Sequence, residues 1–296
     1  SDIQAVGSMM ALLRHAINPN LVQTSEGQPV LVHTGPFGNI AHGCNSVIAD
    51  RLGMKYADFV VTEAGFGADL GFEKFMHIKA RFNNLEPTAV VLVATIRALK
   101  SHGNVQTSKL DTPNKEAVIN GMANLKHLIG VVRSFNLPVV VAINKFPSDT
   151  QSEVSIVKEL CETAGAYATV ESNVFTEGGE GGVELAEAVI AATNEPKREI
   201  SYLYPTNASI EDKVSTLANK VYGAEHVKWS VTAKKKLETY YELGWGQLPV
   251  CMAKTHLSIS HNRTMKGHPT NYTFDVSDVR ASIGAGFIYP VAGNIV

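Results

Sequence analysis

Short runs of β-branched residues alternate with helical stretches along the first two thirds of this chain. The runs at 90–93 and 139–141 are apolar on both faces, as strands of a parallel sheet covered on both sides must be. The strands that this pattern predicts lie at 29–33, 57–62, 89–95, 138–143 and 167–170. The helices predicted between them lie at 41–52, 70–81, 115–135, 153–163 and 182–193. Such alternation indicates an α/β fold with a doubly wound, mostly parallel sheet.

The pattern changes beyond residue 205. Asn207 and Ser209 precede acidic residues as a helix cap would, and helices are predicted at 209–222 and 230–243. Short strands are predicted around 249–255 and 271–276. We therefore expect an α/β region at 1–205 and a smaller α+β domain at 206–296. The chain opens without Met on what reads as a helix, so we also expect the sheet to be incomplete on its N-terminal side.

Composition excludes several classes of protein. The formal net charge of -2 argues against binding of a nucleic-acid backbone, which requires surplus Lys and Arg. Three cysteines far apart in sequence do not suggest a disulfide framework, which favours a reducing, cytoplasmic setting. No apolar run approaches the roughly 18–20 residues that cross a bilayer, so no membrane partner is expected.

Loops rich in Gly and small polar residues follow the predicted strands, at 33–39, 63–71, 97–103 and 144–149, and a fifth at 175–182 precedes a helix. In an open α/β sheet, ligands bind at the carboxyl ends of the strands. Glycine there lets backbone N–H groups approach an anion. Any one of these loops could need Gly only for a tight turn, but five together predict one ligand-binding crevice.

Several familiar sites are missing from the sequence. The G-x-G at residues 65–67 does not complete a dinucleotide fingerprint, and no G-x-x-x-x-G-K-[ST] phosphate loop is present. The spacing of His33, His42, Cys44 and His102 matches no usual metal frame, so no metal ligands are predicted. No G-x-S-x-G elbow is present either.

Residues 93–103 (VATIRALKSHG) closely resemble a signature of the formate–tetrahydrofolate ligases, also called 10-formyltetrahydrofolate synthetases. The signature usually ends in two glycines, whereas Asn104 follows here. Further segments resemble the same family in the same order: 36–46 (PFGNIAHGCNS), 62–71 (TEAGFGADLG), 141–150 (VAINKFPSDT), 177–182 (EGGEGG), 248–255 (LPVCMAKT) and 284–287 (GAGF). The resemblance covers essentially the whole chain.

The resemblance implies a P-loop-type α/β fold, a homotetramer, and a ligation that uses formate, MgATP and tetrahydrofolate, with a monovalent cation expected. Formate would attack the γ-phosphate of ATP to give formyl phosphate and ADP. N10 of tetrahydrofolate would then attack the formyl carbon and release phosphate. A site for this reaction must hold an unstable mixed anhydride, screen its charge and exclude water.

The resemblance also implies roles for particular residues. Phe146 and Pro147 correspond to the family's pterin-stacking pair, and Phe175 falls where the family generally has Trp. Phenylalanine keeps an apolar wall for a flat ring but offers less area. Without the resemblance, Phe146 and Phe175 would read as aromatic residues at the rim of the core.

Charged and glycine-rich positions complete the expected site. Arg97 and Lys100 are expected as catalytic groups that stabilise anionic oxygens, with structural ion pairing as the alternative. Nucleotide contacts are expected from Glu63, Gly65, Gly67 and Asp69, although Asp69 could instead cap the following helix.

The family's Gly-rich ATP loop, its second signature and an Arg used for formyl phosphate would all precede residue 1. We therefore interpret the chain as the C-terminal portion of such an enzyme, and expect no ligase activity from these residues alone. Two alternatives remain. The chain could be a short, catalytically dead paralogue that binds folate or assembles with a full-length subunit, or another P-loop ligase with a similar sheet.

Overall fold

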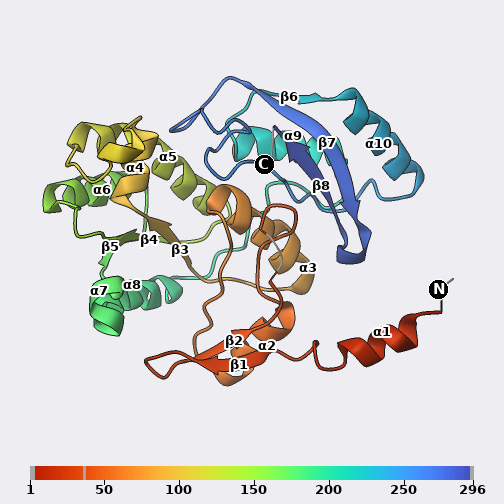
Figure 1. Cartoon of the computed structure of the whole chain (residues 1–296), viewed down its shortest axis with the longest axis horizontal. Helices are drawn as coiled ribbons and strands as arrows, with labels where there is room; N and C mark the ends of the chain where they lie inside the picture. Colours follow the sequence, from red (N-terminus) through yellow and green to blue (C-terminus); the bar gives the residue numbers. More distant parts are fainter. Residues whose placement is uncertain (1–3, 36–37, 294–296) are drawn as a thin grey trace.

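The computed structural model describes residues 4–35 and 38–293, which fold as an α/β protein with three separate sheets (Figure 1). Part of the expected loop at 33–39 and of the motif at 36–46 lies outside the described residues, at 36–37. The expectation for the start of the chain also falls partly outside them, at 1–3. In the described part, no helix has both the length and the apolar character needed to cross a bilayer.

Three of the predicted strands make the parallel sheet. β3 (Val90–Ala94), β4 (Val139–Asn144) and β5 (Ala168–Ser172) lie in the order β3-β4-β5 and all run parallel. Residues 139–143 of the central strand are buried, because helices and neighbouring strands surround them. This burial explains why the run of valines is apolar on both faces. The strands predicted at 89–95, 138–143 and 167–170 are therefore confirmed.

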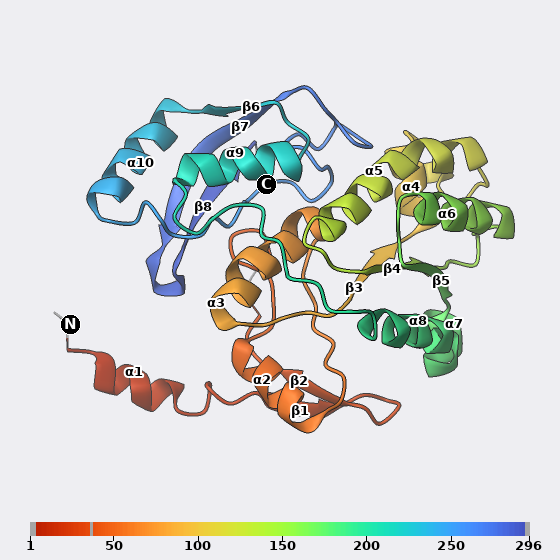
Figure 2. The ribbon, with the colours of Figure 1, turned by 180° about the vertical axis from the view of Figure 1, so that it is seen from behind.

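Helices lie on both faces of this sheet. α4 (Ile96–His102), α5 (Lys115–Arg133) and α6 (Gln151–Thr163) cover one face, and α7 (Val174–Glu177) and α8 (Val183–Thr193) lie on the other (Figures 1 and 2). Short 3-10 turns are found at Thr107–Lys109 (η3) and Gly178–Gly182 (η4).

Helix α4 corrects the sequence analysis, which placed residues 97–103 in a loop. The Thr95 hydroxyl accepts a hydrogen bond from the Ala98 N–H at 3.0 Å and caps a helix that starts directly after β3. The connection between strand and helix is therefore a single residue. Such a short connection leaves no separate loop pattern in the sequence that would mark where the helix begins.

The N-terminal part departs most from the prediction. β2 (Pro29–Val32) confirms a predicted strand, but it pairs antiparallel with β1 (Asn20–Gln23) in a separate hairpin. The strand predicted at 57–62 is wrong: among the described residues no neighbouring strand pairs with this segment. α1 (Val6–Leu13) buries none of its side chains, and α2 (Val47–Tyr56) begins after the Ser46 cap, later than predicted.

The helix predicted at 70–81 is wound mostly as two π-helices, η1 (Ala68–Phe72) and η2 (Phe75–Ala80), followed by α3 (Arg81–Asn83). Five ionisable side chains of this short segment are buried: Asp69, Glu73, Lys74, His77 and Lys79. One pair forms inside the segment, where Nδ1 of His77 lies 2.8 Å from a Glu73 carboxylate oxygen. Since buried charges are costly without partners, such pairs orient the segment.

The last third of the chain forms a mixed three-stranded sheet and two helices. α9 (Ile210–Lys220) and α10 (Val231–Glu242) confirm the two predicted helices. β6 (His226–Trp229) runs parallel to β7 (Thr273–Ser282), which pairs antiparallel with β8 (Phe287–Ala292) after the η5 turn (Ile283–Ala285). Sequence analysis missed β6 and β8. The strand predicted around 249–255 is wrong, since that segment makes two isolated bridges to β8.

One hydrophobic core spans both regions of the chain. It contains buried side chains from the parallel sheet and its helices, such as Phe135, and from the C-terminal sheet, such as Phe274. The division at residue 205 stays a prediction.

Two glycines of α5 give a matched test of how this core is packed. A methyl group on Gly121 would lie 1.9 Å from the carbonyl oxygen of Leu99 in α4, whereas one on exposed Gly130 would meet nothing within 4 Å. We expect Gly121→Ala to lower the free energy of unfolding by about 1–3 kcal/mol, because α4 and α5 must move apart. Gly130→Ala should raise it by about 0.5–1 kcal/mol, since Ala favours a helix. Urea unfolding followed by circular dichroism measures both, and equal shifts would contradict the close contact.

Candidate functional site

The segments that follow β3, β4 and β5 leave the parallel sheet at the same edge. Ala94 pairs with Ile143, and Asn144 pairs with Ser172, so the three strands end in register. The Lys145 N–H donates to the Ser172 carbonyl at 3.2 Å and extends the pairing one residue further. This edge therefore brings together the segments that carry Arg97, Phe146 and Phe175.

Arg97 and Phe146 meet at this edge. The guanidinium carbon of Arg97 lies 5.6 Å from the centre of the Phe146 ring, within the range of a cation–π contact. Arg97 also forms an ion pair with Asp111, whose carboxylate accepts a hydrogen bond from the Ser148 hydroxyl at 3.3 Å. Both the Arg97 side chain and the Phe146 ring are more than one third exposed, so a ligand could reach a cation and a flat apolar surface side by side.

A tight turn fixes the position of Phe146. Its N–H donates to the Asp149 carboxylate at 2.9 Å, and the Asp149 N–H donates back to the Phe146 carbonyl at 2.9 Å. Burial raises the pKa of Asp149, although the bond from Phe146 and nearby Lys100 oppose that shift. Pro147, at the tip of the turn, is exposed.

Phe175 lies across the same edge on α7, and its side chain is 89% exposed. In the described part of the chain, no ring contact joins Phe175 to Phe146. The two rings therefore stand apart at one edge of the sheet, with both open to solvent.

Lys100 does not face the open edge, contrary to its expected catalytic placement. Its side chain is fully buried, with Nζ 2.8 Å from a Glu153 carboxylate oxygen and 3.2 Å from the Leu110 carbonyl. Glu153 also accepts from the N–H groups of Asn114 and Thr150, at 2.8 and 3.1 Å. This geometry favours the alternative that Lys100 is a structural ion-pair partner beneath the site.

The expected nucleotide-binding loop adopts a constrained conformation. Gly67 has φ +84° and precedes η1, and a methyl group on Gly71 would lie 1.8 Å from the Gly65 carbonyl oxygen. Glu63 at the start of the loop is exposed. The residue between the two glycines, Phe66, also has positive φ (+67°) and stacks on His256 with ring centres 5.1 Å apart. Strained positions of this kind are common at functional sites.

Asp69 does not cap the following helix. The N-terminal cap of η1 has no side-chain hydrogen bond, and the Asp69 carboxylate instead lies 2.6 Å from Nζ of buried Lys254. Burial lowers the pKa of Lys254, and Asp69 opposes that shift. Lys254 further donates to the Ser258 carbonyl at 2.7 Å. The segment that begins at Lys254 is thereby tied to the glycine loop, a link that no sequence pattern predicted.

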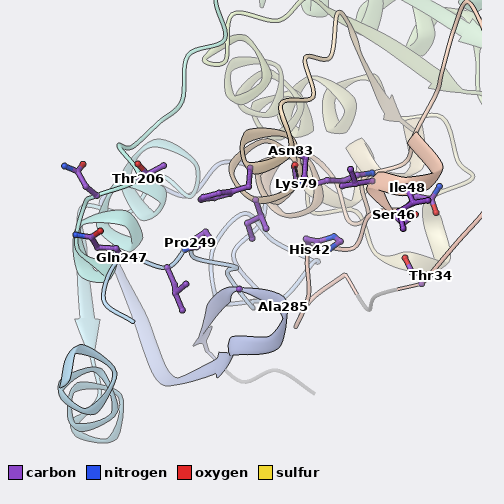
Figure 3. A pocket seen from close by; sticks show the side chains of 18 of the residues that line it. Thr34, His42, Ser46, Ile48, Lys79, Asn83, Thr206, Gln247, Pro249 and Ala285 are labelled. Carbon is purple, nitrogen blue, oxygen red and sulfur yellow. Dashed lines mark hydrogen bonds between the residues drawn. The ribbon is translucent and has the colours of Figure 1, made fainter. Parts of the chain in front are cut away.

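A cavity of about 1130 Å³ lies elsewhere, between α2, the π-helical segment and the C-terminal region (Figure 3). Its lining includes Thr34, His42, Ser46, Lys79, Gln247 and Ala285. Burial, together with Lys79 and Lys74, lowers the pKa of His42. None of the nine residues expected at the site lines this cavity. Sequence analysis missed it because its walls come from five distant segments.

Metal binding finds no support in the described residues, where no group of three or more His, Cys, Asp and Glu side chains is placed to hold an ion. The side chains at the sheet edge are an arginine, a phenylalanine in a tight turn and a second, exposed phenylalanine.

The buried Lys100–Glu153 pair predicts a pH dependence of stability. Burial alone would raise the pKa of Glu153, but hydrogen bonds from Lys100, Asn114 and Thr150 lower it from 4.5 to about 2. A lowered pKa stabilises the folded state above pH 4.5, and this contribution is lost as the pH falls towards 2. We expect Glu153→Gln to cost about 3–5 kcal/mol at pH 7, because it leaves Lys100 buried and unpaired. The variant should also lose less stability between pH 4.5 and 2 than the unmodified chain.

Urea unfolding at a series of pH values measures both effects, with Glu159→Gln on the exposed face of α6 as the control. Identical pH profiles for the Glu153→Gln variant and the unmodified chain would contradict this role of the pair.

Comparison with known proteins identifies the family. The family model described as formate–tetrahydrofolate ligase matches residues 1–296. The chain is 51% identical over 302 residues to the formate–tetrahydrofolate ligase of Roseiflexus sp. (strain RS-1), and 51% identical over 300 residues to that of Desulforamulus reducens. It is 50% identical over 303 residues to the enzyme of Herpetosiphon aurantiacus. Each match covers 99% of this chain and 53% of the relative, so the chain spans about half the length of these curated relatives. From the matched family model and these identities, the chain belongs to the formate–tetrahydrofolate ligase family.

Proposed function

We propose that this chain forms the folate-binding side of an ATP-dependent formate–tetrahydrofolate ligase. The observation that carries the proposal is the Arg97–Phe146 contact at the carboxyl edge of the parallel sheet, in a chain that belongs to this family. A pterin is a flat, polar-edged heterocycle, and an exposed phenyl ring beside a guanidinium offers it both stacking and a fixed positive charge.

The reaction needs two steps. A formate oxygen attacks the γ-phosphorus of ATP, and the bond to ADP breaks to give formyl phosphate. N10 of tetrahydrofolate then attacks the formyl carbon, phosphate leaves, and the nitrogen loses its proton. In this proposal, Phe146, Pro147 and Phe175 hold the pterin so that N10 faces the formyl carbon, and Arg97 stabilises the anionic oxygens of formyl phosphate.

Lys100 has a supporting role in this proposal. Its buried pair with Glu153 joins α4, which carries Arg97, to α6, which follows the Phe146 turn. Removing its charge would therefore disturb the positions of the groups that touch substrate rather than a bond to substrate itself.

In this proposal, the loop with Glu63, Gly65, Gly67 and Asp69 lies at the nucleotide. Glu63 and the loop backbone remain available for nucleotide contacts, whereas Asp69 acts through Lys254 by fixing the loop. MgATP, a monovalent cation, a P-loop-like doubly wound sheet, a homotetramer and a cytoplasmic setting belong to the same proposal. They follow from the family and not from contacts within these residues.

Substitution of Phe146 tests the folate site. Stacking on an aromatic side chain contributes about 1–3 kcal/mol to binding of a flat ring. We expect Phe146→Ala to raise the Kd for tetrahydrofolate by about five- to 150-fold, which corresponds to that loss. Isothermal titration calorimetry under reducing conditions measures the change.

Phe82 provides a matched control. It is also a partly exposed phenylalanine, but it lines the separate 1130 Å³ cavity. Phe82→Ala should leave the Kd for tetrahydrofolate unchanged. If Phe82→Ala weakens binding and Phe146→Ala does not, folate binds in that cavity and the proposed site is wrong.

A further inference from the structure

The tip of the β1–β2 hairpin reaches across the molecule to the glycine-rich loop after α7 (Figures 1 and 2). The Gly179 N–H donates a hydrogen bond of 2.7 Å to a carboxylate oxygen of Glu26, 153 residues earlier in the chain. Hydrogen bonds to a charged acceptor are shorter and stronger than neutral ones. This bond links two segments that no sequence pattern connects.

The carboxylate of Glu26 fits closely against two glycines. A methyl group on Gly178 would lie 2.6 Å from one carboxylate oxygen, and one on Gly179 would lie 2.3 Å from the other. Gly178 also has φ +61°, a backbone conformation that residues other than glycine rarely adopt. Bare α-carbons at both positions therefore allow the carboxylate to approach the backbone.

The hairpin presents Glu26 on a well-defined turn. The Thr24 N–H donates to the Gln28 carbonyl at 2.9 Å, and the Gln28 N–H donates to the Thr24 hydroxyl at 3.0 Å. Gly27 completes the turn with φ +90°. The backbone at Glu26 is already ordered by this turn. Formation of the hydrogen bond to Gly179 therefore costs less conformational entropy than it would from a flexible segment.

The loop that receives this bond directly follows α7, which carries Phe175. In the described part of the chain, the other hydrogen bonds that the structure gives to residues 174–181 join them to close neighbours in sequence, such as Asn173. α7 has only four residues and buries none of them. Segments with few buried contacts open at little cost in free energy. A single long-range hydrogen bond therefore makes a large contribution to the free energy that keeps this loop in place.

We propose that Glu26 is a positioning residue, which latches the glycine-rich loop so that Phe175 faces the folate site opposite Phe146. The inference rests on the proposed function, because it assumes that Phe175 forms one wall of the pterin site. Without the latch, the loop spends less time in the competent arrangement. The apparent Kd for tetrahydrofolate then rises in proportion to the loss of that population.

Substitution of Glu26 in the 296-residue chain tests this proposal. We expect Glu26→Ala to raise the Kd for tetrahydrofolate by about three- to tenfold, and Glu26→Gln to have a smaller effect because its amide oxygen still accepts a hydrogen bond. Amide hydrogen exchange of residues 174–182 should become faster in Glu26→Ala. The Tm should not change, since Glu26 is exposed and lies outside the core.

Two further variants separate the latch from a general effect of charge. Glu180→Ala removes a carboxylate from the same loop that makes no side-chain hydrogen bond or ion pair in the described structure, and should leave Kd and exchange unchanged. Gly179→Ala should displace the Glu26 carboxylate and reproduce the effects of Glu26→Ala. Combining Gly179→Ala with Glu26→Ala should then add little, because both remove one contact.

The outcomes distinguish this inference from the proposed function. If Phe146→Ala weakens folate binding while Glu26→Ala changes neither the Kd nor the exchange of the loop, the latch is wrong and the folate site stands. Tighter binding in Glu26→Ala would also overturn the latch, because Glu26 would then be competing with a ligand carboxylate. If the unmodified chain binds no tetrahydrofolate, both proposals fail. Faster amide exchange of residues 174–182 in Glu26→Ala would then show only that Glu26 stabilises this segment.

Discussion

The buried ion pair between Lys100 and Glu153 supports the edge of the sheet on which the proposed site depends. Glu153 receives hydrogen bonds from Lys100, Asn114 and Thr150, and these donors belong to α4, to the start of α5 and to the start of α6. A buried carboxylate without these donors would be costly, so the three segments are held together as a unit. The half-exposed side chains Arg97 and Phe146 stand on this unit.

The proposed site combines a part held by several contacts and a part with few buried contacts. Arg97 and Phe146 are held by a helix, an ion pair and a tight turn, whereas Phe175 stands exposed on a four-residue helix followed by glycines. A rigid wall can position a flat ring, and a mobile wall can admit it and close over it. In our proposal, the bond between Glu26 and Gly179 restricts the positions that the segment next to Phe175 can adopt.

Buried charges also connect the two regions of the chain. Asp69 in the π-helical segment pairs with Lys254, and the same segment carries Glu73 and His77, which accepts from the Leu203 N–H at 3.2 Å. Glu73 and His77 pair with each other within the segment, whereas Asp69 and the second ring nitrogen of His77 find partners in distant parts of the sequence. The glycine loop at 65–71 is therefore shaped as much by the C-terminal segment as by its own glycines.

Elements that depend on contacts close in sequence were predicted more accurately than elements that depend on distant partners. The strand at 139–143 was predicted correctly because its burial leaves a continuous apolar run. The strand at 90–94 shows the same apolar pattern, although Val91 and Val93 are exposed and only Leu92 is buried. The strand predicted at 57–62 was wrong, since β-branched residues indicate a strand only when a neighbouring strand is there to pair with. Helix α4 was missed because a single capping residue, Thr95, separates it from β3.

By itself, the sequence determined the family, the α/β class, the parallel strands and the turn that follows β4. The family followed from the resemblance of its motifs, whereas the class and the strands followed from local composition and periodicity, which reflect burial residue by residue. Only the tertiary structure decided that Lys100 is a buried partner of Glu153, that Asp69 binds Lys254, and that Glu26 meets Gly179. A charged side chain looks the same in sequence whether it faces solvent, a substrate or a buried partner, because its role is set by groups that folding brings near it.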